Sequence, residues 1–393
     1  MKSYVKNERF VIELNGRIDS NNSDAVDREI RQALTGNPGL PLVLDASALA
    51  YISSSGLRVL MRLVKGGHGD MTITGVSPEV YEIFETTGMT CIMNVKKRMR
   101  QVDIEGCPII GEGAFGTVYR LDGDTVVKVY RNGEASLPII EGEIAKSRVA
   151  FVSGMATAIP FDIVRVGDQY GSVFEMIDAH NCNSLVKDDP AALEALIPRY
   201  AAFLKEMHSM ELAPGQLEFA RDSYLENLEA FAPVLEPEVR ARLRALLEAM
   251  PEDLHLLHGD AQLKNIMLSS GEIVAIDLDH ICTGNPVFEF ASLYATYVAF
   301  NEDDPTDTLV FMGLDKDTAE RIYRETLLDY LGDVAPAALE AIERKIRTLA
   351  YLRFLEILVI ELADLHTPLK DLQIRHAAEH LKALAFQVED LTM

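Results

Sequence analysis

The sequence predicts an α/β domain followed by a larger α+β region, in which a strand-rich part precedes a helical part. Three observations support this fold class. Short apolar runs alternate with amphipathic stretches over the first hundred residues, β-rich runs flank glycines in residues 109–131, and apolar residues recur at helical spacing in residues 188–362. At 393 residues the chain is long for one hydrophobic core, since a domain usually holds about 100–200 residues.

The composition indicates a globular protein, and the distribution of charge limits the partners that it can bind. Hydrophobic residues make up 48% of the chain and charged residues 25%, which is typical of a globular protein. Residues 1–100 carry 13 Lys and Arg against 11 Asp and Glu, which leaves 24 against 50 for the remainder. This acidic remainder repels nucleic acid and anionic membranes and favours a cationic partner. We therefore expect no nucleic acid and no membrane among its partners.

The expected compartment is the cytoplasm. The first residues lack the basic region, apolar run and small-residue cleavage site of a secretory signal. The most apolar later segment, residues 351–362, is too short to span a bilayer and contains charged residues. The four cysteines form no C-x-x-C pair, which suits reduced thiols.

The first domain is predicted from alternating elements. Residues 10–14 alternate as a strand does, residues 23–34 have helical spacing, and residues 40–47 form a buried-strand run. A serine cluster then leads into an amphipathic helix that ends at Gly66 and Gly67. A further strand follows, and a proline at the first position begins another helix; these two elements cover residues 71–76 and the segment from Ser77-Pro78.

The stretch "LDASALAYISSSGLRVL" resembles the signature of STAS domains, the fold of anti-sigma-factor antagonists. The resemblance covers about residues 3–97, and we place this domain at residues 1–98. It implies phosphorylation at Ser54, beside Ser55, and an anti-sigma factor or STAS-type protein as partner. A phosphate there would meet free N–H groups at a helix N-terminus. Ser53 stands where the antagonists often have aspartate, and a serine cap without phosphorylation is the alternative.

The second region begins with a glycine-rich segment. In "IIGEGAFGTVYRLDGDTVVKVYR", Gly111, Gly113 and Gly116 lie between two β-rich runs, and Lys128 lies in a later hydrophobic strand. Glycines allow the backbone to approach a polyphosphate, and a lysine supplies positive charge to it. The segment is neither a dinucleotide fingerprint, because a strand follows it, nor a Walker loop, because it lacks GK[ST].

A second segment concentrates acids among apolar residues. Asp260, Asn265, Asp277 and Asp279 fall within "LHGDAQLKNIMLSSGEIVAIDLDH". Burial of an unpaired carboxylate is costly, so acids in such surroundings usually bind something cationic. Two acids and an amide offer the oxygen ligands that magnesium prefers. A metal site is therefore predicted here.

This H-G-D-x-x-x-x-N segment with its later I-D-x-D resembles the aminoglycoside phosphotransferase family of the protein-kinase-like fold, across about residues 106–390. The resemblance implies a β-rich lobe at residues 106–178 and a helical lobe at 179–393. It also implies ATP and Mg²⁺ as cofactors. Asp260 would accept or orient the proton of the substrate hydroxyl, and Lys128 would steady the phosphates. Asn265 and Asp277 would hold magnesium, with Asp279 either a second ligand or an outer partner.

The same resemblance extends to two further elements. In kinase folds a helical glutamate pairs with the strand lysine; Glu143 is favoured for this role and Glu141 is the alternative. Residues 170–179 resemble the strand and hinge that bind an adenine base through backbone groups around Glu175 and Ile177.

The acceptor is predicted to be a small-molecule hydroxyl, of the aminoglycoside, sugar or amino-alcohol type. Protein kinases have H-R-D, a lysine two places later and A-P-E, whereas this chain has Gly259, Gln262 and no A-P-E. Two alternatives stay open: a regulatory protein kinase with Ser54 as its phosphosite, and a nucleotide-sensing module. The family's G-D-P-x-x-D element appears as "GNPVFEFA", with Asn285 and Glu289 in the acidic places. The resemblance also gives three acidic residues as candidates for the lining of the acceptor pocket: Asp303, Asp304 and Glu361.

Overall fold

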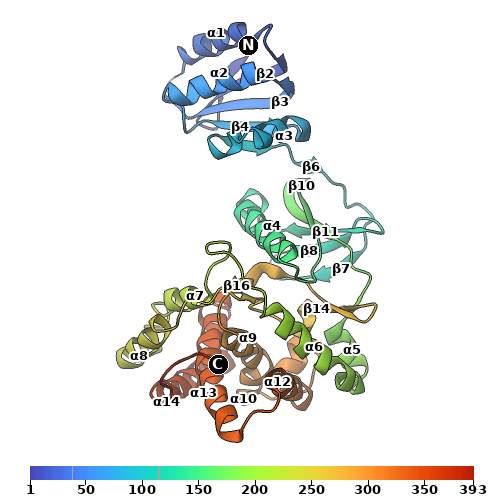
Figure 1. Ribbon diagram of the computed structural model, residues 1–393, viewed down its shortest axis with the longest axis vertical. Coiled ribbons are helices and arrows are strands. Elements are labelled where there is room, and N and C mark those ends of the chain that lie inside the picture. The colour runs from blue at the N-terminus through green and yellow to red at the C-terminus, as the bar shows by residue number, and fades with distance from the viewer. Residues whose placement is uncertain (38, 114–115) are drawn as a thin grey trace. The chain divides into compact units, whose positions relative to one another are not determined.

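The computed structural model describes residues 1–37, 39–113 and 116–393 (Figure 1). The chain divides into two compact units, Met1–Asp103 and Ile104–Met393. Each unit has a hydrophobic core of its own, as expected for a chain of this length. The predicted domain limits at residues 98 and 106 lie on either side of the division.

The first unit is a five-stranded sheet with helices, which confirms the predicted α/β class. Its strands lie in the order β1–β2–β3–β4–β5. The pair β1–β2 is antiparallel and the other pairs are parallel. The strands are β1 (Ser3–Lys6), β2 (Arg9–Ile18), β3 (Leu42–Ile52), β4 (Thr72–Val76) and β5 (Asn94–Lys97), and the short strand β6 (Arg100–Gln101) follows.

Three helices connect these strands: α1 (Ser23–Leu34), α2 (Ser54–Lys65) and α3 (Pro78–Thr86). Helices α2 and α3 begin where the sequence predicts, because Ser53 and Ser77 each accept hydrogen bonds from free N–H groups of the first turn. Helix α1 also begins at the predicted residue, without a side-chain cap. The strand β3 is longer than the predicted run of residues 40–47. A single 3₁₀ turn, Met89–Cys91, precedes β5.

The second unit begins with the strand-rich lobe. Its strands follow the order β10–β11–β9–β8–β7, and each neighbouring pair is antiparallel. Helix α4 contacts β10 and β11. The β-rich runs on either side of the glycines and the lysine-bearing strand occur as predicted. The elements are β7 (Ile109–Glu112), β8 (Gly116–Arg120), β9 (Thr125–Tyr130), α4 (Leu137–Val152), β10 (Pro160–Val166) and β11 (Gln169–Glu175).

The remainder is helical, with two small sheets that carry the polar segments. Helices α9 and α13 pack against each other in the larger core, and every residue of α9 is buried. The helices are α5 (Cys182–Asp188), α6 (Leu193–Met207), α7 (Ala220–Asn227), α8 (Pro237–Glu248), α9 (Val287–Tyr294), α10 (Phe300–Asp303), α11 (Asp307–Met312), α12 (Lys316–Leu331), α13 (Pro336–Glu356) and α14 (Pro368–Leu384). The small sheets are β12–β14–β15 (His180–Asn181, Ile266–Ser269, Glu272–Ala275) and β13–β16 (Leu256–Leu257, Cys282–Thr283).

Apolar spacing alone suggests single helices over residues 223–235 and 336–362, but the limits of both helices differ in the structure. The helix expected at residues 223–235 ends at Asn227, and the following residues form turns with i→i+3 hydrogen bonds before Pro233. The helix expected at residues 336–362 ends at Glu356 and continues as one π-helical turn, Ile357–Glu361. Periodicity does not distinguish these local geometries, because the apolar residues keep nearly the same face.

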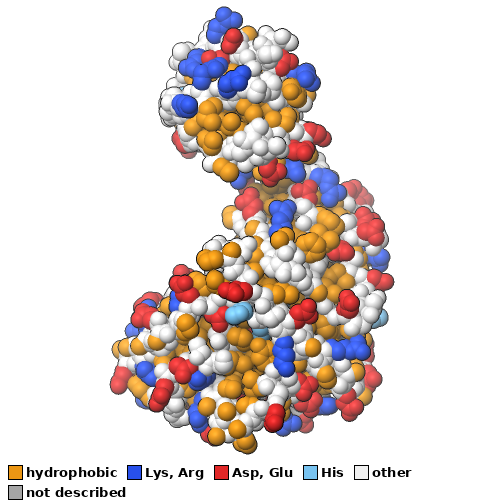
Figure 2. Space-filling view, in the orientation of Figure 1, with side chains coloured by type: hydrophobic (Ala, Val, Ile, Leu, Met, Phe, Trp, Pro, Cys, Tyr) orange, Lys and Arg blue, Asp and Glu red, His pale blue; other side chains and the backbone are white. Residues whose placement is uncertain are grey.

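The surface of the second unit agrees with its acidic composition. Figure 2 shows Asp and Glu side chains spread over the visible face of this unit rather than gathered in one patch. Among the described residues, no helix combines the length and the apolar character that a bilayer crossing requires.

Candidate active site

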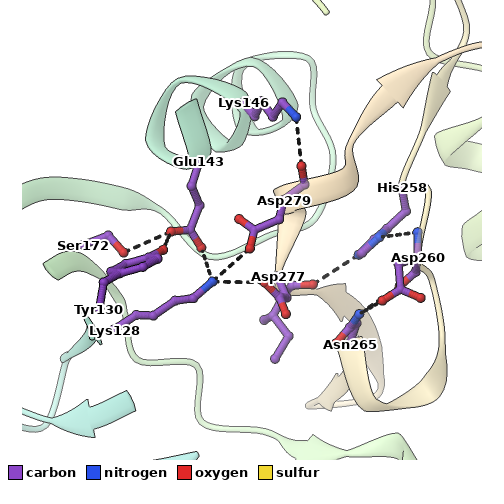
Figure 3. Close-up of polar contacts among 11 residues, drawn as sticks. Lys128, Tyr130, Glu143, Lys146, Ser172, His258, Asp260, Asn265, Asp277 and Asp279 are labelled. Atoms are coloured by element: carbon purple, nitrogen blue, oxygen red, sulfur yellow. Dashed lines mark hydrogen bonds and ion pairs between the residues drawn. The ribbon is translucent and has the colours of Figure 1, made fainter. Parts of the chain in front are cut away.

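The loop between β13 and β14, the segment after β15 and strand β9 bring the predicted residues together (Figure 3). Asp260 follows β13, and Asn265 ends the 3₁₀ turn between β13 and β14. Asp277 follows β15 and has left-handed backbone angles, φ 60° and ψ 66°. A non-glycine residue rarely adopts this conformation, which occurs more often at functional sites than elsewhere.

Lys128 lies among three carboxylates. Its Nζ atom is 2.7 Å from Glu143 Oε1, 3.2 Å from Asp277 Oδ1 and 3.1 Å from Asp279 Oδ2. Another lysine, Lys146, lies on helix α4. Its Nζ atom donates to the Asp279 carbonyl at 2.8 Å. Helix α4 is therefore tied to the acidic segment after β15 both through Lys128 and directly.

Glu143 is buried and has two further donors. The hydroxyls of Tyr130 and Ser172 both donate to its Oε2 atom, the latter at 3.2 Å. Burial raises the pKa of Glu143 to about 7, against the lowering effect of Lys128. Burial would lower the pKa of Lys128, but the three surrounding carboxylates raise it above its ordinary value. Lys128 is thus a cation.

Of the predicted metal ligands, Asp277 and Asp279 lie beside Glu143, and Asn265 lies beside Asp260. Carboxylate oxygens of Glu143, Asp277 and Asp279 lie within 4.8 Å of one another. The Asn265 amide nitrogen donates to the Asp260 carbonyl at 2.9 Å and to Asp260 Oδ2 at 3.0 Å. This leaves the amide oxygen of Asn265 as its metal-binding atom. The combined oxygen donors fit a hard divalent cation.

Asp260 is held by its neighbours in the catalytic loop, residues 258–265. Its Oδ2 atom accepts hydrogen bonds from Gln262 Nε2 at 2.9 Å and from Asn265 Nδ2. His258 Nδ1 accepts from the Asp260 N–H at 3.3 Å, while His258 Nε2 lies 3.1 Å from the Ile276 carbonyl. The His258 ring therefore links the catalytic loop to the segment that carries Asp277, which agrees with a supporting role.

Glu289 supports the same loop from the core. Its Oε2 atom accepts from the N–H groups of His258 at 2.7 Å and Gly259 at 3.1 Å, and its Oε1 atom accepts from Ala261 at 3.2 Å. The sequence identified Glu289 only as a departure from the family's aspartate. The only signal for its role was an acid within an apolar helix.

Glycine is required at two positions of the site. Gly259 has φ +77°, and a Cβ atom there would lie 2.4 Å from the His280 carbonyl oxygen. At Gly116, a Cβ atom would lie 2.2 Å from the Val129 carbonyl oxygen of the neighbouring strand. At Gly111 and Gly113 the nearest described atoms are at ordinary contact distance. The intervening Ala114 and Phe115 lie outside the described residues.

The predicted hinge has few free backbone groups. The N–H of Glu175 donates to the Ile159 carbonyl, and that of Met176 donates to the Asp124 carbonyl. The Glu175 carboxylate accepts from the Ile159 N–H at 3.2 Å. Among the hydrogen bonds between described residues, none uses the N–H of Ile177, so this is the group of the predicted hinge that is available to a base.

The acids suggested for an acceptor pocket already have partners. Asp303 pairs with His376, Asp304 accepts from Thr306, and Glu361 lies 2.5 Å from Arg353. These contacts are among residues of the helical lobe. None of these three contacts is with a residue of the Asp260 loop.

The serine cluster of the first unit is at the start of α2. Ser53 Oγ accepts from the N–H groups of Ser55 at 3.2 Å and Gly56 at 3.5 Å. Ser54 is exposed, and Ser55 Oγ accepts from Arg58 at 3.0 Å. Ser53 therefore provides the cap, and the hydroxyl of Ser54 is accessible.

Comparisons with known proteins agree with both domains. Residues 1–102 match the STAS domain model. An anti-sigma F factor antagonist from Paenibacillus polymyxa is 27% identical over 89 residues, which are 22% of this chain and 76% of that protein. BtrV from Bordetella bronchiseptica, assigned as an anti-sigma factor antagonist, is 33% identical over 85 residues, which are 21% of this chain and 72% of that protein.

Other matches extend over most of the chain. The structure of a GDP complex of aminoglycoside 2′-phosphotransferase-IIIa is 14% identical, with a TM-score of 0.46, and the match covers 78% of this chain and 98% of that one. Residues 107–325, more than half of the chain, match the model of the phosphotransferase enzyme family. The chain therefore belongs to the phosphotransferase enzyme family and has a STAS domain at its N-terminal end.

Proposed function

We propose that the protein transfers the γ-phosphoryl group of ATP to an alcohol of a small molecule, with magnesium as cofactor. The observation that carries this proposal is the contact of Lys128 with Glu143, Asp277 and Asp279. A strand lysine paired with a helical glutamate and facing a metal-binding acid is the arrangement that holds nucleotide phosphates in kinase-type enzymes.

The roles of the side chains follow from their positions. Lys128 would donate to the nucleotide phosphates, and Glu143 would keep it directed toward them. Asn265 and Asp277 would hold Mg²⁺, which when bound neutralises phosphate charge. Asp260 would orient the acceptor hydroxyl and accept its proton as the O–P bond forms. Because little covalent chemistry is left to the protein, its contribution is positioning and electrostatic stabilisation.

A small molecule is the acceptor that the catalytic loop favours. Protein kinases place a lysine two residues after the catalytic aspartate, and here Gln262 occupies that place and bonds to Asp260 instead. The acidic charge of the second region favours an acceptor with an amine. Aminoglycosides, amino sugars and amino alcohols combine an amine with a hydroxyl.

Replacement of Asp260 tests the assignment. We expect Asp260→Asn to abolish ADP release while nucleotide affinity stays within about threefold, since Asp260 does not contact Lys128. Asp333→Asn, at an exposed position, serves as a matched control. Acceptors are found by screening magnesium-dependent ADP release over aminoglycosides, sugars, amino alcohols and nucleosides. Retention of turnover by Asp260→Asn would contradict the assigned role.

A second candidate function is phosphorylation of a protein serine within anti-sigma-factor signalling. The observation that favours it is the exposed hydroxyl of Ser54 at the start of α2, in a domain related to anti-sigma factor antagonists. Incubation with γ-labelled ATP separates the two functions. Stoichiometric label that disappears in both Ser54→Ala and Asp260→Asn favours the protein kinase, whereas acceptor-dependent ADP release without protein label favours the small-molecule enzyme.

A further inference from the structure

Glu289 has a further neighbour, the imidazole of His208. His208 directly follows helix α6, and 2% of its side chain is exposed. Its Nε2 atom lies 3.7 Å from Glu289 Oε2, which is an ion-pair distance rather than a hydrogen bond. Its Nδ1 atom lies 3.0 Å from the hydroxyl of Tyr330 on helix α12. Half-buried Tyr330 and the buried residues His208 and Glu289 thus form a chain of contacts that ends at the catalytic loop.

The carboxylate of Glu289 needs such a neighbour. Its side chain is fully buried, and its two oxygens accept three backbone N–H groups. Burial raises the pKa of Glu289, but the His208 and His258 imidazoles and the Gly259 N–H outweigh it and leave the pKa below the ordinary value. A protonated Glu289 would present an O–H group to N–H groups that require an acceptor.

The position of the imidazole is itself fixed. The His208 and Tyr330 rings meet edge to face, with centroids 5.5 Å apart. Among the described residues, Nε2 of His208 has no hydrogen-bond partner. A buried ring nitrogen without a partner, facing a buried carboxylate, acts through its charge or its N–H dipole.

We propose that His208 is a positioning residue for phosphoryl transfer: it keeps Glu289 in the form that accepts three N–H groups and so fixes the backbone of residues 258–261. The direction of the Asp260 carboxylate follows from this backbone. The contribution to turnover rests on the proposed function, whereas the effect on the loop does not. His208, α9 and α12 would then set the geometry of a residue that none of them contacts.

Hydrogen exchange of the N–H groups of residues 258, 259 and 261 tests the effect on the loop without any substrate. We expect His208→Leu to exchange at these three amides at least about tenfold faster than the wild type. His208→Gln retains an N–H donor without a charge, and we expect an increase of about threefold. His366→Gln, at an exposed position, is the matched control and should leave the three rates unchanged.

Steady-state ADP release from MgATP, with the acceptor that gives the highest rate in the screen of aminoglycosides, sugars, amino alcohols and nucleosides, gives the second readout. We expect His208→Leu to lower kcat about 10- to 100-fold with the KM for ATP within about twofold, since a displaced catalytic group costs turnover rather than binding. His208→Leu combined with Glu289→Gln should be no slower than Glu289→Gln alone, because both changes act through one carboxylate.

Wild-type exchange rates in a folded His208→Leu variant would overturn the proposal, as would independent, additive effects of the two substitutions. If His208→Leu does not fold, wild-type exchange in His208→Gln overturns it equally. If the wild type shows no magnesium-dependent ADP release with any acceptor of the screen, the proposed function fails, while the exchange rates still decide the role of His208 in the loop.

Discussion

Lys128 and Glu143 form an ion pair of 2.7 Å that joins strand β9 to helix α4. The carboxylate is buried and 16% of the lysine side chain is exposed, so the pair is weakly screened by solvent. The pair fixes the distance between the strand and the helix at the point where nucleotide phosphates would bind. The same lysine contacts both aspartates of the I-D-x-D segment.

Lys128→Met removes the only cation that these three carboxylates share in the described structure. We expect kcat to fall by about 10²- to 10³-fold, because a positioned donor to the transferring group is lost. Lys205→Met, at an exposed position of α6, is the control for general loss of positive charge. ADP release with a fixed acceptor measures the effect, and near-normal turnover of Lys128→Met would be incompatible with the site.

Asp277 and Asp279 are expected to differ in their effect on magnesium. Asp277→Asn should raise the Mg²⁺ concentration for half-maximal ADP release by more than about 100-fold, since Asp277 is proposed as a direct ligand of the ion. Asp279→Asn should raise it only about tenfold, which is the smaller effect expected of an outer partner that acts on the ion through its direct ligands. Titration with Mg²⁺ after removal of metal with EDTA gives both values. Equal effects would show that both aspartates bind the ion directly.

Gly259→Ala should destabilise the helical lobe by more than backbone strain alone. A left-handed alanine costs about 1–2 kcal/mol, and the new Cβ atom would meet the His280 carbonyl oxygen at 2.4 Å. Gly215→Ala isolates the first cost, since Gly215 has φ +81° with no atom within 4 Å of an added Cβ. Urea unfolding measures both variants. If Gly259→Ala and Gly215→Ala lower the free energy of unfolding equally, the close approach to His280 does not affect stability.

Glu289 should link stability to pH in a defined direction. Its pKa is lowered in the folded state, so its stabilisation is present above its ordinary value of 4.5 and is lost as the pH falls toward the folded value. Glu289→Gln should be less stable at pH 7 by about 1–3 kcal/mol, because a backbone N–H loses its acceptor. The difference in the free energy of unfolding between Glu289→Gln and the wild type should become smaller below about pH 4.5.

Chemical unfolding between pH 7 and pH 3.5 checks this expectation, with Glu252→Gln as an exposed control. A gap that stays constant or widens on acidification would show that Glu289 is not the stabilising carboxylate.

Much of the fold could be predicted from the sequence because its signals are local. The caps at Ser53 and Ser77 define helix starts, and the glycine-rich segment before Lys128 defines a strand pair. The segments of the site follow the same logic, since each residue of the H-G-D and I-D-x-D stretches lies beside a predicted strand.

The contacts between distant segments could not be predicted. His208 and Glu289 are 81 positions apart, and Lys146 reaches the Asp279 backbone, which has no side-chain signal. A histidine near the end of a helix has no pattern that assigns its partner. By contrast, the sequence favours Glu143 over Glu141 as the partner of Lys128, and the structure places its Oε1 atom 2.7 Å from Lys128 Nζ.

Glu289 belongs to a helix that is buried along its whole length, and its carboxylate holds the loop that carries Asp260. The loop is thereby part of the cooperative unit formed by the helical lobe, not a separately melting surface segment. On heating, enzymatic inactivation and the loss of helical ellipticity should consequently coincide at one temperature. Mutations in the interior of this lobe would then reduce the working range of the enzyme as much as changes near the nucleotide.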